Sequence, residues 1–201
     1  MDVHNVTAEA ETFTCNAYLA TGKQTTLVDA GAMRGVVDVI REHAGELDAV
    51  VLTHQHGDHV QRLDAVLDAF DATLYAYGSH PRRDHALADG DTLTIGDEEC
   101  AVVYTPGHAD DHVSLVSDAA LFSGDVVVYN DGAFDDGSFG RTDMAGQSRE
   151  RLIESLQDLL PHLDGVEAMY AGHGDPFTGD VTEVVERALE RAQRREPKYP
   201  E

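Results

Sequence analysis

The stretch Thr53-His54-Gln55-His56-Gly57-Asp58-His59 decides how the rest of the chain is interpreted. It follows residues 49–52, a continuous apolar run that is typical of a strand buried on both faces of a sheet. In an extended chain, side chains two positions apart point the same way, so His54 and His56 can reach one cation. Such a cluster at the end of a strand predicts a metal site.

The remaining ligand-type residues lie at the turn that follows and in later loops. Gly57 lets the backbone turn, and Asp58 and His59 then face the same cavity from the start of the next helix. Three further candidates each stand beside a glycine in a loop at the end of an expected strand: His108, Asp125 and His173. Glycine neighbours permit the close backbone approach that ligand loops often need.

Short segments of two periodicities alternate along the chain, without repeats or linkers. Strands are expected at residues 3–8, 13–20, 25–28, 49–52, 73–77, 92–95, 100–104, 113–116, 120–122 and 166–170. Helices are expected at residues 33–44, 60–70, 149–160 and 181–194. Because strands come in two sets with helices in each half, we predict an α/β fold, a four-layer αββα sandwich, as a single domain over residues 1–201.

The charge excludes two classes of partner. With 14 Lys and Arg against 38 Asp and Glu, the net charge is −24, whereas nucleic acids and anionic membranes attract clustered cations. No apolar run approaches a membrane span, and the N-terminus does not resemble a signal peptide. Cys15 and Cys100 do not form a disulfide framework and are interpreted as small core residues. We expect a soluble, cytoplasmic protein.

The acidic composition resembles that of proteins from salt-in halophiles. Only two of the 14 cations are lysines, Lys23 and Lys198, and aspartates outnumber glutamates. Concentrated salt screens the repulsion between carboxylates, which then mainly keep the surface hydrated. We therefore predict a halophilic protein, with a merely acidic mesophilic protein as the alternative.

The metal-site motifs resemble those of metallo-β-lactamase-fold proteins, from about residue 29 to residue 176. The pattern HxHxDH appears as His54-x-His56-x-Asp58-His59, and the later His, Asp and His follow in the family's order. The resemblance implies that the first metal is held by His54, His56 and His108, the second by Asp58, His59 and His173, and that Asp125 bridges the two. Nitrogen and oxygen donors suit two zinc ions, with iron or manganese as alternatives.

Within that superfamily, the chain is most similar to compact prokaryotic relatives of glyoxalase II. Residues 139–143 (FGRTD) and 170–176 (YAGHGDP) resemble segments of those thioesterases. Because the sequence ends at Glu201, we do not expect the helical domain with which larger glyoxalases II bind glutathione. The likeness implies hydrolysis of a small 2-hydroxyacyl thioester by water activated between two metals, with Asp58 as a catalytic residue.

Three rival functions stay open. A persulfide dioxygenase would use one iron on His54, His108 and Asp125, a lactonase would share the motifs, and an inactive metal-binding protein would keep the ligands without the chemistry. The final glycine-flanked His173 favours two metals over one.

Three residues near the motifs receive supporting roles. Asp29 matches a family position behind the ligands, and we expect it to hydrogen-bond a ligand histidine. Arg141 fits a substrate carboxylate, with a surface ion pair as the alternative. His112 matches a position that is often His in the family without being a ligand.

Overall fold

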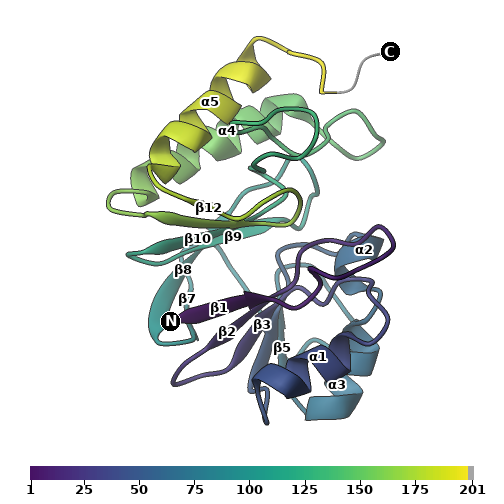
Figure 1. The fold of residues 1–201 in the computed structure, drawn as a ribbon. Helices are drawn as coiled ribbons and strands as arrows, with labels where there is room; N and C mark the ends of the chain where they lie inside the picture. The colour runs from purple at the N-terminus through teal and green to yellow at the C-terminus, as the bar shows by residue number, and fades with distance from the viewer. Residues whose placement is uncertain (199–201) are drawn as a thin grey trace.

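Two six-stranded β-sheets form the centre of the computed structural model, which describes residues 1–198 (Figure 1). In the first sheet the strand order is β1 (Asp2–Asn5), β2 (Tyr18–Thr21), β3 (Thr26–Val28), β4 (Ala49–Val51), β5 (Thr73–Ala76) and β6 (His85–Ala86). In the second it is β12 (Phe177–Thr178), β11 (Ala168–Ala171), β10 (Ala120–Gly124), β9 (Val113–Val116), β8 (Glu98–Tyr104) and β7 (Thr92–Ile95). Both sheets mix parallel and antiparallel pairs.

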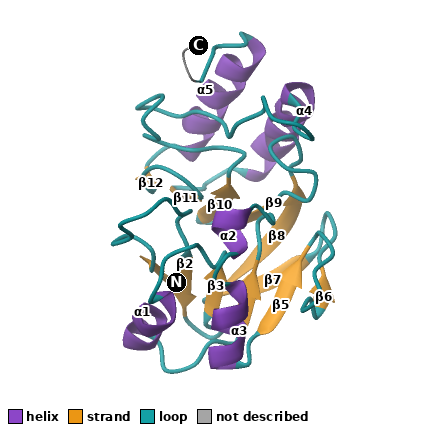
Figure 2. Cartoon of the chain, turned by 90° about the vertical axis from the view of Figure 1, so that its right-hand side faces the viewer, coloured by secondary structure: helices purple, strands orange, loops and turns teal. Residues whose placement is uncertain are grey.

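Helices cover the outer face of each sheet. Figures 1 and 2 both place α1 (Val36–His43) and α3 (Leu63–Phe70) on one side of the molecule. On the other side lie α4 (Arg149–Leu159), followed by a 3-10 turn at Leu160–His162, and α5 (Val181–Gln193). Among residues 1–198, no helix is long and apolar enough to cross a membrane.

Three separate apolar cores join these layers. One packs the first sheet against α1 and α3, with Ile40, Val50 and Leu67 among its members. A second packs the other sheet against α4 and α5, and a third contains side chains from both sheets, such as Val51 and Phe122. Because each interface between layers has its own core, the structure confirms the predicted four-layer αββα sandwich.

The expected strand over residues 13–20 is wrong in its first half, because regular pairing begins only at Tyr18. The backbone N–H groups of Cys15 and Asn16 donate instead to Asp58 O and Gly172 O, in two loops distant in the sequence. Residues 6–17 therefore form a loop that joins other parts of the molecule rather than an extended sheet edge.

The expected helix over residues 60–70 begins later, as α3, and a separate short helix, α2 (Gly57–Val60), precedes it. The break occurs where the backbone N–H of Arg62 donates to Gly31 O, while Gly31 N–H donates to His59 O. These two hydrogen bonds join the end of α2 to the loop after β3. They end α2 as a short helix, which hydrophobic periodicity could not distinguish from α3. The two-residue strands β6 and β12 were also not predicted.

Candidate metal centre

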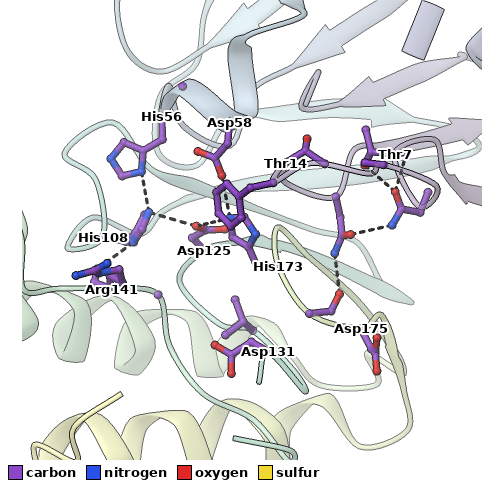
Figure 3. Close-up of a pocket in the computed structure, with 18 of the residues that line it drawn as sticks. Thr7, Thr14, His56, Asp58, His108, Asp125, Asp131, Arg141, His173 and Asp175 are labelled. Atoms are coloured by element: carbon purple, nitrogen blue, oxygen red, sulfur yellow. Dashed lines mark hydrogen bonds and ion pairs between the residues drawn. The ribbon is translucent and has the colours of Figure 1, made fainter. Parts of the chain in front are cut away.

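The predicted ligands lie in loops at one end of the two sheets. His54 follows β4, His56 caps the start of α2, and Asp58 and His59 belong to its single turn. Three more loops, after β8, β10 and β11, contribute His108, Asp125 and His173 respectively. In Figure 3, His56, Asp58, His108, Asp125 and His173 point toward one another. The structure thus brings all seven predicted residues into one centre.

Three histidines form the first group, with their ligand atoms all within 4.8 Å of one another. His56 Nδ1 lies 3.1 Å from His54 Nε2 and 2.9 Å from His108 Nε2. Nitrogens about 2.0–2.1 Å from a tetrahedral zinc ion stand about 3.3 Å apart, so the three rings are close to that arrangement. His108 Nδ1–H donates to Arg141 O at 2.9 Å, which leaves Nε2 free to bind a cation.

The second group consists of Asp58, His59 and His173, whose ligand atoms also lie within 4.8 Å of one another. Asp58 Oδ2 is 3.0 Å from His173 Nε2 and 3.9 Å from His59 Nε2. On the other side of its ring, His59 Nδ1 lies 2.9 Å from Asp29 Oδ2, the contact expected for Asp29. This carboxylate orients the ring so that Nε2 faces the centre.

Asp125 lies between the two groups. Its Oδ2 is 3.3 Å from His108 Nε2 and 3.5 Å from His173 Nε2, and its Oδ1 is 3.6 Å from His59 Nε2. The carboxylate can therefore reach a cation in either group, which is the geometry a bridging ligand needs. Gly172 permits this approach, because a Cβ there would lie 2.2 Å from Asp125 Oδ1.

Two buried polar atoms test whether a cation fits. His59 Nε2 and Asp125 Oδ1 have no hydrogen-bond partner among the described residues, although buried polar groups are normally paired. Both atoms face the same space, and a divalent cation there would satisfy both. The donor set of imidazoles and carboxylates suits zinc, iron or manganese.

Burial and charge prepare these groups for a cation. Burial lowers the pKa of His54 well below its usual range, and burial also lowers the pKa of His108. Both rings are therefore neutral, as a metal ligand must be. Burial opposes ionisation of Asp125, but the positive charge of His59 holds the pKa of this carboxyl well below its usual range.

His112 lies directly beneath Asp125 but outside both groups. Its Nε2 accepts a hydrogen bond from the Asp125 backbone N–H at 2.9 Å, and its Nδ1 lies 2.9 Å from Thr105 Oγ1. Burial lowers the pKa of His112 to about 3, so the ring stays neutral. It supports the loop of Asp125 from behind, consistent with the prediction that it is not a ligand.

Arg141 lies at the edge of the centre. Its guanidinium donates two hydrogen bonds to the carboxylate of Asp143, at 2.9 and 2.8 Å, while its carbonyl accepts from His108. The structure therefore contains the surface ion pair that was the alternative expectation for Arg141. The same guanidinium is the group that would bind a substrate carboxylate. Binding of substrate by Arg141 stays a prediction.

A cavity of about 1160 Å³ opens over the centre, and its rim is partly apolar. Phe13 stacks on His173, with ring centroids 5.2 Å apart and an interplanar angle of 15°. Phe13 is 78% exposed and Met144 is 58% exposed; both line this cavity, and they are the exposed large hydrophobic side chains of residues 1–198. This rim could not be predicted from the sequence, because an isolated hydrophobic residue in a loop has no periodic signal.

Cys15 is buried, as predicted for a core residue, yet it lies behind the centre rather than in an apolar core. Its Sγ lies within 4.8 Å of a carboxylate oxygen of Asp29 and a ring nitrogen of His59. Burial raises the pKa of the Cys15 thiol to about 11. The thiol is therefore protonated and packs against the back of a predicted ligand. Its position follows from the loop of residues 6–17, because the expected strand over residues 13–20, in which Cys15 falls, begins only at Tyr18.

Comparison with known proteins connects this centre to one superfamily. Residues 10–83 match the family model for the metallo-beta-lactamase superfamily. The probable metallo-hydrolase YqgX of Bacillus subtilis is 31% identical over 84% of this chain and 88% of its own length. A hydroxyacylglutathione hydrolase of Francisella philomiragia is 33% identical over 68% of this chain, but the match spans only 53% of that relative. The solved structure of TTHA1623 in a di-iron-bound form has a TM-score of 0.69 and 26% identity, over 87% of this chain and 93% of that one.

Proposed function

Since the chain belongs to the metallo-β-lactamase superfamily, we propose that it is a metal-dependent hydrolase that holds two divalent cations, by preference zinc, and cleaves a small 2-hydroxyacyl thioester. The thioester substrate is suggested by the hydroxyacylglutathione hydrolases. Because the match to that relative spans about half of its length, the substrate belongs to the proposal and not to the family assignment.

One observation carries the proposal: Asp125 stands between two complete groups of ligand-type side chains. His54, His56 and His108 form one group and the second contains Asp58, His59 and His173. A centre for a single cation would need only one of them. The orphaned atoms His59 Nε2 and Asp125 Oδ1 support a cation on the second side as well.

When bound, two divalent cations in such a centre lower the pKa of a water molecule and polarise a carbonyl group. The side chain of Asp58 is 20% exposed and lines the cavity, where it can accept the proton of an attacking water. A thiolate leaves readily, since its parent thiol has a pKa of about 8.5. Hydrolysis therefore does not require a general acid that protonates the leaving group. Arg141, at the edge of the cavity, would bind a carboxylate of the substrate.

The experiment is elemental analysis of protein purified at high salt, followed by assays with thioesters, lactones and persulfides. We expect two zinc ions per chain and thioester hydrolysis. One iron with oxygen consumption on persulfides would favour a dioxygenase, preferential lactone hydrolysis a lactonase, and metal without turnover an inactive metal-binding protein.

A pair of variants sharpens this test. His173→Ala removes a ligand of the second group, so we expect one cation per chain and at least a hundredfold loss of thioester hydrolysis. His162→Ala changes an exposed histidine after α4 and should keep both cations and full activity. Two cations in His173→Ala would contradict the assignment of the second group.

A further inference from the structure

The loop that carries His173 is held by Asn16, a residue about 155 positions away in the sequence. The side-chain amide Nδ2 of Asn16 donates to Ala171 O and to Gly174 O, both at 2.9 Å. Its backbone N–H donates to Gly172 O at 2.7 Å. Asn16 therefore bonds the carbonyls on both sides of His173, in a loop that has just left strand β11.

A second amide fixes which way the Asn16 side chain points. Asn16 Oδ1 accepts a hydrogen bond from Asn5 Nδ2 at 2.8 Å. Asn5 Oδ1 in turn accepts from the backbone N–H and the hydroxyl of Thr7, each at 3.0 Å. Because oxygen and nitrogen of the Asn16 amide face opposite kinds of partner, a flipped amide would lose all three bonds.

The ring of His173 lacks a support that two other predicted ligand histidines have. Partners behind their rings hold His59 and His108, through Asp29 and the Arg141 carbonyl respectively. Within residues 1–198, the polar contacts of the His173 ring run through Nε2, the atom that faces Asp58 and Asp125. Its direction must therefore come from its backbone and from the stacked ring of Phe13.

We propose that Asn16 is a positioning residue for the second cation. Asn16 holds residues 171–174 so that His173 Nε2 lies next to Asp58 and His59. This inference rests on the two-cation centre of the proposed function. Tyr18 Oη also donates to Ala171 O at 2.9 Å, so β11 itself stays anchored without Asn16. The amide matters most on the Gly174 side, beyond the ligand.

Asn16→Asp tests the inference with a change of nearly equal shape. The carboxylate removes both donors and turns an oxygen toward the carbonyls of Ala171 and Gly174, so that the loop is repelled. Loss of a group that orients a ligand lowers metal affinity by about 10- to 100-fold. We expect that loss for the second cation only, with the cation on His54, His56 and His108 retained.

Asn130→Asp is the matched control. Asn130 Nδ2 donates to Asp175 Oδ2 at 2.6 Å, on the same loop but beyond the carbonyls next to His173. This variant adds the same charge and loosens the same region without touching those carbonyls. It should bind two cations with the affinities of the unchanged protein.

The measurement is equilibrium dialysis against buffered zinc, repeated with Co²⁺, whose absorption reports the ligand set of each site. Melting of the metal-free proteins shows that both variants are folded. If Asn16→Asp does not fold, Asn5→Ala removes the bond that orients the Asn16 amide, together with the acceptor of Thr7, but keeps both bonds from Asn16 to the His173 loop. It should give an intermediate loss of second-site affinity.

Two tightly bound cations in Asn16→Asp, or an equal loss in Asn130→Asp, would overturn the role of Asn16 alone. A single cation in the unchanged protein would instead overturn the two-cation centre, and this inference with it.

Discussion

Asp29 connects the two halves of the centre at the scale of a single residue. Its carboxylate accepts hydrogen bonds from the backbone N–H and the hydroxyl of Thr53, at 2.9 and 2.7 Å, and lies 2.9 Å from His59 Nδ1. Its φ of 61° is in the left-handed region, which Asp and Asn tolerate better than branched residues. One side chain thus holds the end of β4 and a predicted ligand together.

Asp29→Asn should weaken zinc binding. Asparagine can adopt the same φ, but it has one acceptor oxygen where the carboxylate has two, so either Thr53 or His59 loses its partner. We expect about a 10- to 100-fold lower affinity for the second cation, measured by competition with a chelator. Asp48→Asn removes an exposed carboxylate that accepts from Thr25 N–H and should leave the affinity unchanged.

Asp125→Ala should lower metal affinity more than the loss of a ligand that faces one group, because the two oxygens of Asp125 face different groups. We expect weaker binding of both cations and loss of hydrolysis, checked by elemental analysis after dialysis. Asp118→Ala, an exposed aspartate between β9 and β10, is the control. Unchanged metal content in Asp125→Ala would refute the bridging role.

At the scale of elements, the position of each ligand loop depends on a helix or loop packed behind it. The loop with His108 rests against the start of α4, where Ser148 N–H donates to Gly107 O at 2.8 Å and Ser155 Oγ donates to Pro106 O at 2.6 Å. Gly107 has a φ of 130°, and a Cβ there would lie 2.4 Å from the backbone nitrogen of Leu152. The outer helix layer and the first ligand group are therefore in direct contact.

Gly107→Ala should destabilise the fold and displace His108. Strain at positive φ costs about 1–2 kcal/mol and overpacking about 1–3 kcal/mol, so we expect a loss of about 2–5 kcal/mol in the free energy of unfolding. Gly35→Ala separates the two effects, because Gly35 also has positive φ (87°) but its Cβ would meet nothing within 4 Å. Urea unfolding of both variants measures the difference, and equal losses would mean that packing against α4 is unimportant.

At the scale of the whole molecule, the net charge of −24 opposes the compact state. Cations offset it locally in ion pairs such as Lys198–Asp131, which is nearly buried, with Nζ and Oδ2 2.6 Å apart. Most of the 38 acidic residues cannot each have a cationic partner of their own, since there are only 14 Lys and Arg. Stability should therefore depend on the salt concentration.

We expect low stability in dilute buffer, restored by molar KCl and partly by zinc. The screening length falls from about 30 Å at 0.01 M to about 3 Å at 1 M salt, which removes most of the repulsion between carboxylates. Zinc acts differently, because binding to ligands from four separate segments joins the two halves of the chain. Thermal melts of metal-free and zinc-loaded protein across a KCl series measure both effects. A melting temperature that does not change with KCl would refute the halophilic prediction and leave the metal centre unaffected.

The sequence alone predicted the two sheets, the covering helices and the residues of the centre, because these depend on local spacing. Hydrophobic periodicity distinguishes strands from helices, and His54, His56, Asp58 and His59 are brought together by one strand end and one turn. The later loops could be found as well, since each ligand-type residue stands beside a glycine.

Only the tertiary structure decided how the loops support one another. Asn16 bonds the His173 loop and Phe13 stacks on His173, and both contacts join residues far apart in the sequence. The break between α2 and α3 depends on a similar contact, from Arg62 to Gly31. A polar loop residue has no periodicity that tells which distant carbonyl its amide will meet. That choice is made when the two sheets pack, and with it the direction in which His173 points.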